Sequence, residues 1–339
     1  MGNIRTERTR LTLRWSTYDP RTMIPSFLLM GELLTLVLLT GASKLALATA
    51  VPFVLFPELS ALSYNVFSRP AGAWANAPVM MVITPTATAV CGVLITQHLA
   101  YGLPSVALCV TLAIVLMRLL RSPIAPAISA GFLPLVLGLT SWQYPASIAF
   151  VTAVLAISSI AYRRIFSKRI PAAKPSSSQK ANPEAGRTSD RFAWIPLFAG
   201  FLMLAYALGA LTGLRLILFP PLIVIAYEMF VHPDTCPWAA RPYALAAVSA
   251  IAAGVGVALV SLSGVGPLSV AIALIASAGT LRLFRLNFPP ALAICLLPQI
   301  ITAPGLGFIA AVALGSVTLA ITFVASRAYP RVEGARGMH

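Results

Sequence analysis

Long runs of apolar residues follow one another along nearly the whole chain, separated by short polar or proline-containing stretches. Ile24 to Thr40 and Ser105 to Met117 lie inside two such runs. A helix needs about 20 mainly apolar residues to cross a bilayer, because each residue rises about 1.5 Å through a hydrocarbon core about 30 Å thick. The pattern therefore predicts an all-α fold, a polytopic transmembrane helix bundle.

The apolar runs predict about six membrane segments in each half of the chain. They are expected at 24–42, 45–62, 79–98, 104–120, 125–140 and 144–162, and then at 194–213, 215–230, 243–262, 267–283, 289–303 and 305–326. Six crossings return the chain to the side where it started, so both termini and the segment between the halves are expected in one compartment. Five crossings per half would place that segment opposite the N-terminus, an arrangement that the charges disfavour.

The two halves share a sequence pattern, which predicts an internal repeat. At an offset of 163 residues, Leu55, Phe56, Pro57, Tyr64, Phe67 and Pro70 match Leu218, Phe219, Pro220, Tyr227, Phe230 and Pro233. At an offset of 164, Trp74, Pro78, Gly92, Gly102, Ser105, Arg118, Arg121, Pro126, Ala127 and Pro134 match Trp238, Pro242, Gly256, Gly266, Ser269, Arg282, Arg285, Pro290, Ala291 and Pro298. Matches of Trp, Pro and Arg at nearly one offset do not arise easily by chance. We therefore expect two parallel tandem repeats that insert in the same orientation.

This pattern divides the chain into five parts. They are a basic N-terminal tail (1–23), transmembrane repeat 1 (24–162), a basic linker (163–192), transmembrane repeat 2 (193–327) and a C-terminal tail (328–339). The linker is rich in Lys, Pro, Ser and Ala and has little apolar surface to bury, so it is expected to be flexible.

Composition and charge support a membrane protein and exclude a soluble domain. Of the 339 residues, 58% are hydrophobic and only 10% charged, whereas soluble domains have about 25% charged residues. Sixteen of the 24 Lys and Arg residues lie in residues 1–23, 163–191 and 327–339, which predicts that these parts are cytoplasmic and that only Lys44 and Arg215 face outward. The expected location is the plasma (inner) membrane of a bacterium. No folded basic face for nucleic acid is expected.

Proline interrupts the second and fifth segments of each half. In the first half the interruptions are Pro52 and Pro57, and then Pro126 and Pro134. Proline lacks a backbone donor and leaves a carbonyl that lipid cannot satisfy, so these segments are expected to pack inside the bundle or to re-enter. Short, proline-interrupted segments at matching positions of two repeats point to the binding site of a transporter.

The motifs around these prolines resemble those of the HPP family of membrane proteins. The stretches are LMRLLRSPIAPAISAGFLPL and TLRLFRLNFPPALAICLLPQ, and each half also has a segment that ends in LFP. The resemblance implies a membrane protein that moves a small anion such as nitrite. The family's histidine is absent from both halves, where Ile124-Ala125-Pro126 and Phe288-Pro289-Pro290 stand, and its earlier loop is reduced to Asn76-Ala77-Pro78 and Ala240-Arg241-Pro242.

Two arginine pairs are candidates for binding a small anion. Residues three apart on a helix share a face, so each pair presents two cations together. The alternative is ordinary anchoring at the membrane surface by positive charge. Pro126 and Pro290 next to the pairs, and the recurring Tyr64 and Tyr227, complete the predicted site, although tyrosine also occurs in interfacial aromatic belts. The arginines are Arg118, Arg121, Arg282 and Arg285.

Glu32 is the candidate for proton coupling. It is expected in the middle of the first segment, where an unpaired carboxylate costs a few kcal/mol. The alternative is a structural Glu that is protonated or hydrogen-bonded inside the protein. Glu58 and Glu228 are expected nearer the cytoplasmic ends of their segments, where they could reach the interface.

Residues for catalysis are scarce. Five of the nine acidic residues lie in the tails and the linker, and no phosphate loop, dinucleotide motif or metal-ligand spacing occurs. We expect no enzyme, no cofactor and no metal. Two functions remain, a permease for a small anion and a non-transporting membrane scaffold; the expected partners are the lipid bilayer and that anion, and a homo-oligomer stays open.

Overall fold

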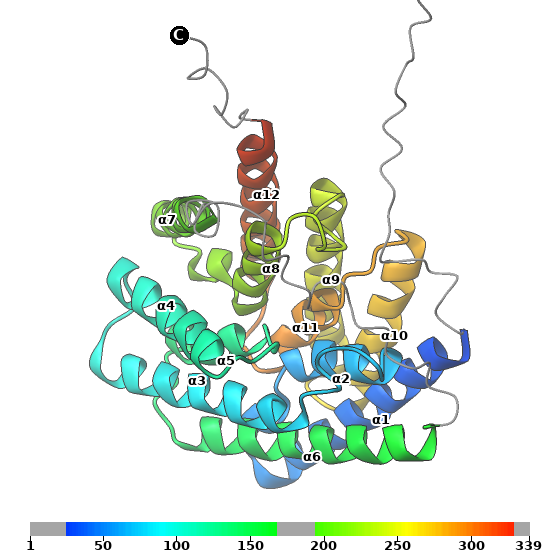
Figure 1. The fold of residues 1–339 in the computed structure, drawn as a ribbon. Helices are drawn as coiled ribbons and strands as arrows, with labels where there is room; N and C mark the ends of the chain where they lie inside the picture. The colour runs from blue at the N-terminus through cyan, green and yellow to red at the C-terminus, as the bar shows by residue number, and fades with distance from the viewer. Residues whose placement is uncertain (1–24, 168–193, 329–339) are drawn as a thin grey trace, which may run out of the picture.

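The computed structural model describes residues 25–167 and 194–328, and in these residues the chain is helical without strands (Figure 1). The predicted tails and most of the linker lie outside the described residues. The elements are α1 (Pro25–Thr49), η1 (Pro52–Val54), α2 (Glu58–Ser68), α3 (Pro78–His98), α4 (Leu103–Leu119), α5 (Ala127–Leu137), α6 (Gln143–Ile165), α7 (Trp194–Thr212), η3 (Arg215–Leu218), α8 (Pro220–Val231), α9 (Pro242–Ser263), α10 (Pro267–Leu283), α11 (Pro290–Leu296), η4 (Leu297–Gln299) and α12 (Leu306–Ala328).

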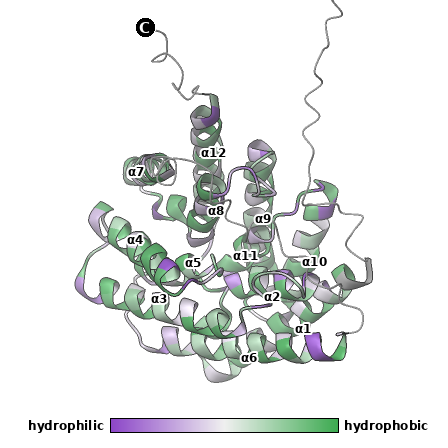
Figure 2. Cartoon of the chain, viewed as in Figure 1, coloured by the Kyte–Doolittle hydropathy of each residue, from purple (hydrophilic) through white to green (hydrophobic). Residues whose placement is uncertain are grey.

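Six of these helices, α1, α3, α6, α7, α9 and α12, are long and apolar enough to cross a membrane. The 21 residues of α3 span about 31 Å, the thickness of the hydrocarbon core. Large apolar side chains such as Leu211 and Leu262 are exposed on the surface, and hydrophilic residues gather at helix ends and in loops (Figure 2). The prediction of a multi-pass helical membrane protein is confirmed.

The four short helices α2, α5, α8 and α11 form the centre of the molecule (Figure 1). Every residue from 127 to 136 in α5 is buried, and so is every residue of α11. Each of these helices begins at or directly after a proline, which suits the first turn of a helix because its missing N–H has no intrahelical acceptor there. The proline-containing segments are therefore buried in protein, as the sequence predicts.

These short helices begin deep inside the bundle. Ala127, the first residue of α5, accepts a hydrogen bond of 2.7 Å from the hydroxyl of Thr88, which lies at the middle of α3. Gly92 in α3 lies against the backbone of Gly131 in α5, and Gly256 in α9 lies in the same way against Cys295 in α11. Near α8, Gly315 at the middle of α12 lies against the carbonyl of Ile217. We call α2, α5, α8 and α11 the half-helices, because each has 12 residues or fewer, whereas about 20 are needed to cross a bilayer.

The second predicted segment, 45–62, is wrong in its bounds. α1 continues to Thr49, the chain then forms η1 and an irregular stretch, and α2 begins only at Glu58 and continues to Ser68. Hydropathy cannot detect this break, because the apolar run continues across it. The break follows from Pro52 and Pro57, which cannot donate to a continuous helical ladder.

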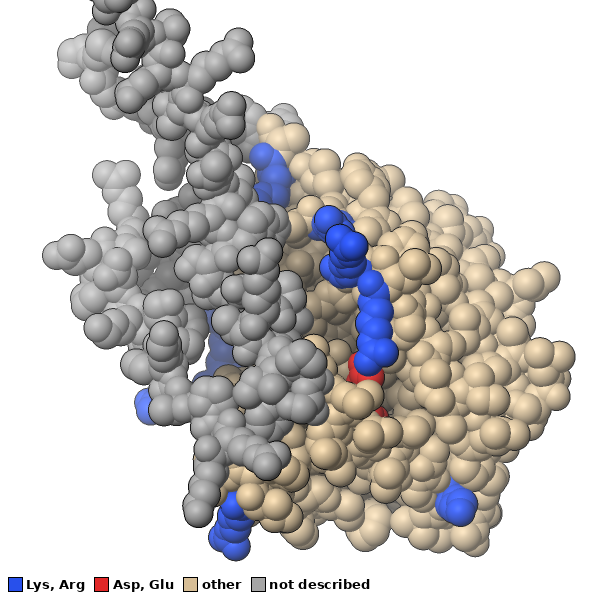
Figure 3. Space-filling model, turned by 90° about the vertical axis from the view of Figure 1, so that its right-hand side faces the viewer, with Lys and Arg blue, Asp and Glu red and all other residues tan. Residues whose placement is uncertain are grey.

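Basic residues gather at one end of the bundle, which we call the basic end and define by Arg118, Arg163, Arg241, Arg282 and Arg327. Arg282, near the end of α10, pairs with Glu32, near the start of α1. Arg241 donates to Phe284 at the end of α10, and Arg327, near the end of α12, pairs with Asp234 in the loop between α8 and α9. Figure 3 shows a row of basic side chains that ends beside acidic side-chain atoms.

The contacts between the two halves are reciprocal. α1 packs against α10 while α4 packs against α7, and α2 packs against α11 while α5 packs against α8. In Figure 1, α3 and α6 of the first half run across the view, whereas α9 and α12 of the second half stand upright. The half-helices therefore supply the central part of the contact between the halves.

The close approach of α3 and α5 generates a stability prediction. A Cβ added at Gly92 would overlap the carbonyl oxygen of Gly131, whereas one added at Gly254 in α9 meets open space. We expect Gly92→Ala to destabilise the protein by about 1–3 kcal/mol, the usual effect of overpacking. Gly254→Ala is the matched control and is expected to melt like the wild type in detergent. Equal melting temperatures for the two variants would show that the helices do not approach this closely.

Candidate functional site

The two predicted arginine pairs have the same backbone geometry. Arg121 and Arg285 each have a φ of 49°, in the left-handed region that favours glycine. The N–H of Arg121 donates to Arg118 O at 3.1 Å and the N–H of Ser122 to Met117 O at 2.9 Å, and the same two bonds recur at Arg285 and Leu286. Each pair therefore ends its helix in a tight left-handed cap, and an arginine occupies a position where glycine would be less strained.

Glu32 and Arg282 form an ion pair that joins the two halves. The Glu32 side chain is 19% exposed and its carboxylate contacts the Arg282 guanidinium. Tyr64 lies beside them, in a pocket of about 210 Å³ between α1 and α10. Glu32 is thus neither unpaired nor deep inside the bundle. Its proposed role in proton coupling stays a prediction, and the contact itself is one that fastens α1 to α10.

Arg118 makes the corresponding contact on the other side, but with aromatic residues. Its guanidinium lies 5.3 Å from the centre of the Trp194 ring, the first residue of α7, and beside the hydroxyl of Tyr227 in α8. Trp194 and Tyr227 pack edge to face at 5.9 Å. Such a cation over an indole ring is attractive by about 0.5–1 kcal/mol at exposed sites. Arg118 thereby fastens α4 to the second half.

The arginines are at two separate places. Arg118 lines a pocket of about 440 Å³ between α4 and α7, and Arg282 lines the pocket between α1 and α10, and the two pockets have no lining residue in common. Pro126 and Pro290 lie elsewhere, buried at the starts of α5 and α11. The structure thus brings Tyr64 to Arg282 and Tyr227 to Arg118, and leaves both prolines in the centre.

Glu58 is a candidate that the sequence reasoning missed. It was expected near the cytoplasmic end of its segment, and this is wrong: it is the first residue of α2 and is only 2% exposed. The hydroxyl of Ser129 in α5 donates to Glu58 Oε1, and Glu58 Oε2 has no hydrogen-bond partner among the described residues. The signal in the sequence was the order Pro57-Glu58 inside an apolar run, which is typical of a helix start.

The surroundings of Glu58 disfavour a charge. An ionised carboxylate in the membrane interior costs several kcal/mol unless it is paired. The partial positive charge at the start of α2 offsets about 0.3–1 kcal/mol of this, or about 2 kcal/mol in the best partly buried geometry, and one serine hydroxyl adds about 1.5–3 kcal/mol. The neutral acid is therefore the form that this packing accommodates, and a change of surroundings would change its protonation.

Side chains around Glu58 contact backbone carbonyls of α5, one of which Pro134 leaves free. Pro134 cannot donate to Ala130 O, and the hydroxyl of Tyr144 donates to that oxygen instead, at 2.8 Å. The thiol of Cys109 lies 3.2 Å from Gly131 O. The centre of the first half is thus a small polar cluster inside an apolar core.

At the opposite end of the bundle, Arg215 fastens the halves together. Its guanidinium donates to Leu135 O near the end of α5 and lies 4.0 Å from the centre of the Tyr101 ring. Burial raises the pKa of Tyr101 to about 12, even though Arg215 lowers it, so the hydroxyl keeps its proton and donates to Arg215 O at 3.5 Å. The two halves therefore make charged contacts at both ends of the bundle.

Among the described residues, no group of three or more His, Cys, Asp or Glu lies together in a way that could hold a metal ion. No protein-family model, no curated protein and no solved structure matches this chain. The resemblance to the HPP family therefore stays a prediction.

The left-handed caps generate a prediction about Arg121. A non-glycine residue in this conformation costs about 1–2 kcal/mol, so Arg121→Gly is expected to leave the thermal stability in detergent unchanged or to raise it by about 1 kcal/mol. The comparison is Arg118→Gly, which places glycine inside the last turn of α4 and also removes the contact with Trp194, and is expected to lower stability by about 1–2 kcal/mol. If Arg121→Gly destabilises as much as Arg118→Gly, the Arg121 side chain itself supports the fold.

His232 generates a prediction about pH. Its Nδ1 lies 3.3 Å from Glu228 Oε2, and this hydrogen bond raises the pKa of His232 above its ordinary 6.5, although burial and Arg118 oppose the shift. The contact should stabilise the protein fully below the unfolded pKa, and the stabilisation should disappear as the pH rises through the folded pKa. Nuclear magnetic resonance of the imidazole in detergent should give a lower His232 pKa in Glu228→Gln than in the wild type. An unchanged pKa would contradict the contact.

Proposed function

We propose that this protein is a permease for a small anion, built from two like-oriented units that enclose the path between them. The observation that supports it is the buried carboxyl of Glu58 at the meeting point of the half-helices α2 and α5. Intramembrane acids of this kind occur where a membrane protein moves ions or protons. Discontinuous helices at matching positions of two repeats are typical of transporters.

Several observations support two units in one orientation. The residue matches at offsets of 163 and 164 include proline, tryptophan and arginine, and the contacts between the halves are reciprocal. Arg121 and Arg285 have the same φ and the same cap hydrogen bonds. The ends of α4 and α10 and the starts of α1 and α7 meet at the basic end through Arg118 and Arg282. Positive charge at that end favours a cytoplasmic position, in the plasma membrane of a bacterium.

An anion is the solute that the half-helices favour. α5 and α11 begin inside the bundle, where the positive end of the helix dipole attracts negative charge. The basic end would raise the local concentration of anions. Nitrite, which the HPP resemblance suggests, is the first solute to test.

Coupling to protons follows from charge repulsion at Glu58. An anion near the start of α5 would be repelled by an ionised Glu58 carboxylate and accepted by the neutral acid, so anion and proton would bind together. On the other side, the anion leaves, and the Glu58 carboxyl releases its proton to water. One anion and one proton cross together, and no net charge moves. In this mechanism Glu58, rather than Glu32, carries the proton.

Movement of one unit against the other would open the path. In the described conformation the half-helices are packed dry, with Phe132, Leu222 and Leu292 fully or almost fully buried. Opening at the basic end would break the contacts of Arg118 and Arg282, and opening at the other end would break those of Arg215. The two sets of contacts are thus proposed to open in turn.

The alternative is a non-transporting membrane scaffold, and the same dry packing favours it. A bundle whose centre never opens could present the basic end to a cytoplasmic protein. The flux experiment below decides between the two functions.

The test is uptake of nitrite, nitrate and formate into proteoliposomes. One anion moving with one proton accumulates about tenfold for an inward gradient of one pH unit. We expect this gradient to drive uptake in the wild type and in Glu32→Gln, the control, and to have no effect in the nearly isosteric Glu58→Gln.

Two results would contradict the proposal in different ways. Flux at the level of empty liposomes for every anion would exclude the permease and support the scaffold. Uptake by the wild type that is the same with and without the pH gradient would support a permease but exclude proton coupling through Glu58. Folding of each variant is checked by its melting temperature.

A further inference from the structure

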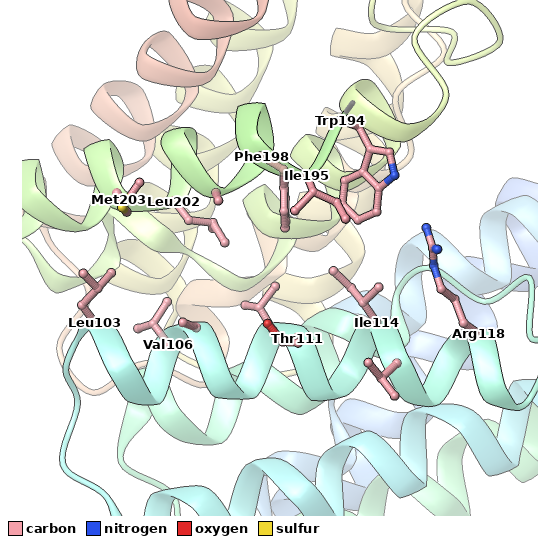
Figure 4. A pocket seen from close by; sticks show the side chains of 14 residues that line it. Leu103, Val106, Thr111, Ile114, Arg118, Trp194, Ile195, Phe198, Leu202 and Met203 are labelled. Carbon is pink, nitrogen blue, oxygen red and sulfur yellow. The ribbon is translucent and has the colours of Figure 1, made fainter. Parts of the chain in front are cut away.

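The pocket between α4 and α7 is an apolar groove with a cation at one end. It has a volume of about 440 Å³, and among its lining residues only Thr111 and Arg118 are polar or charged apart from the indole of Trp194. Figure 4 shows α4 and α7 alongside each other, with apolar side chains from both helices facing the space between them and Arg118 and Trp194 at the same end. The other end is lined by Leu103.

The length of the groove suits a lipid chain. Leu103 and Arg118 are fifteen residues apart on one helix, which corresponds to about 22 Å. The hydrocarbon part of one leaflet is about 15 Å deep, half of the 30 Å core. A single acyl chain can therefore lie along Val106, Val110 and Phe198 over its whole length while its headgroup remains at the basic end.

The charge at the end of the groove suits an anionic headgroup. The Arg118 side chain is exposed and has an aromatic contact but no ion pair among the described residues. Arg121 follows one turn later. Basic pockets between transmembrane helices bind anionic lipid headgroups, and tryptophan is enriched at the level of these headgroups.

The matching pocket between α1 and α10 has neither the size of the groove nor a cation without an ion pair. Its volume is about 210 Å³, and its arginine, Arg282, is paired with Glu32. An anionic headgroup there would compete with a carboxylate that is already in contact. The two pockets therefore provide a comparison within one molecule.

We propose that the groove between α4 and α7 binds an anionic phospholipid, with an acyl chain between the two helices and the phosphate at Arg118. The lipid would link α4 of the first half to α7 of the second. This inference does not depend on the proposed transport function.

The experiment is native mass spectrometry of the purified protein titrated with phosphatidylglycerol or phosphatidylcholine. The wild type is expected to bind one phosphatidylglycerol at least tenfold more tightly than phosphatidylcholine. Arg118→Met should abolish this preference, and the matched control Arg282→Met should keep it. Ala107→Trp, which fills the groove, should weaken binding of the lipid, and inorganic phosphate should not compete.

The proposal is overturned if both lipids bind equally to the wild type, or if Arg118→Met retains the preference. Competition by inorganic phosphate at millimolar concentration would indicate a site for a free anion rather than for a lipid. The melting temperature of each variant shows whether it folds, and Glu32→Gln provides a second check, because a released Arg282 should add a weaker second site.

Discussion

Backbone groups inside a membrane must find partners within the protein, and this constraint accounts for the centre of the structure. Proline breaks the second and fifth segments of each half, and the freed carbonyls cannot face lipid. Pro134 frees Ala130 O, and the hydroxyl of Tyr144 donates to it, while the hydroxyl of Thr88 adds a second bond to Ala127 O. The broken segments therefore lie in the middle of the bundle, where side chains from intact helices surround them.

Close packing of the half-helices follows from the same constraint. A hydroxyl or thiol reaches a freed carbonyl only where backbones approach closely, and Gly92 and Gly256 permit that approach. The packing also encloses the side chain at the start of α2. In the first half this is Glu58 with Ser129 as its partner, whereas at the matching offsets the second half has Pro221 and Ala293. The two halves thus differ at the one buried acid of the described residues.

Electrostatic contacts between the halves show a similar asymmetry. Arg282 is neutralised by Glu32, whereas Arg118 contacts aromatic rings. An ion pair closes one pocket to further anions, and a cation over a ring leaves the other able to accept one. The two halves are therefore fastened together in two different ways, by an ion pair at Arg282 and by aromatic contacts at Arg118.

The sequence alone determined the class of fold, because apolar runs of this length with few charges would expose too much apolar surface to water. It also located the proline-broken segments and the arginine pairs. It did not determine where α1 ends or where Glu58 lies, because hydropathy continues across the break at Pro52 and Pro57. Which side chains meet across the halves, such as Glu32 with Arg282 and Trp194 with Arg118, was decided only by the tertiary structure. These partners are distant in the chain, and local pattern contains no information about which helix faces them.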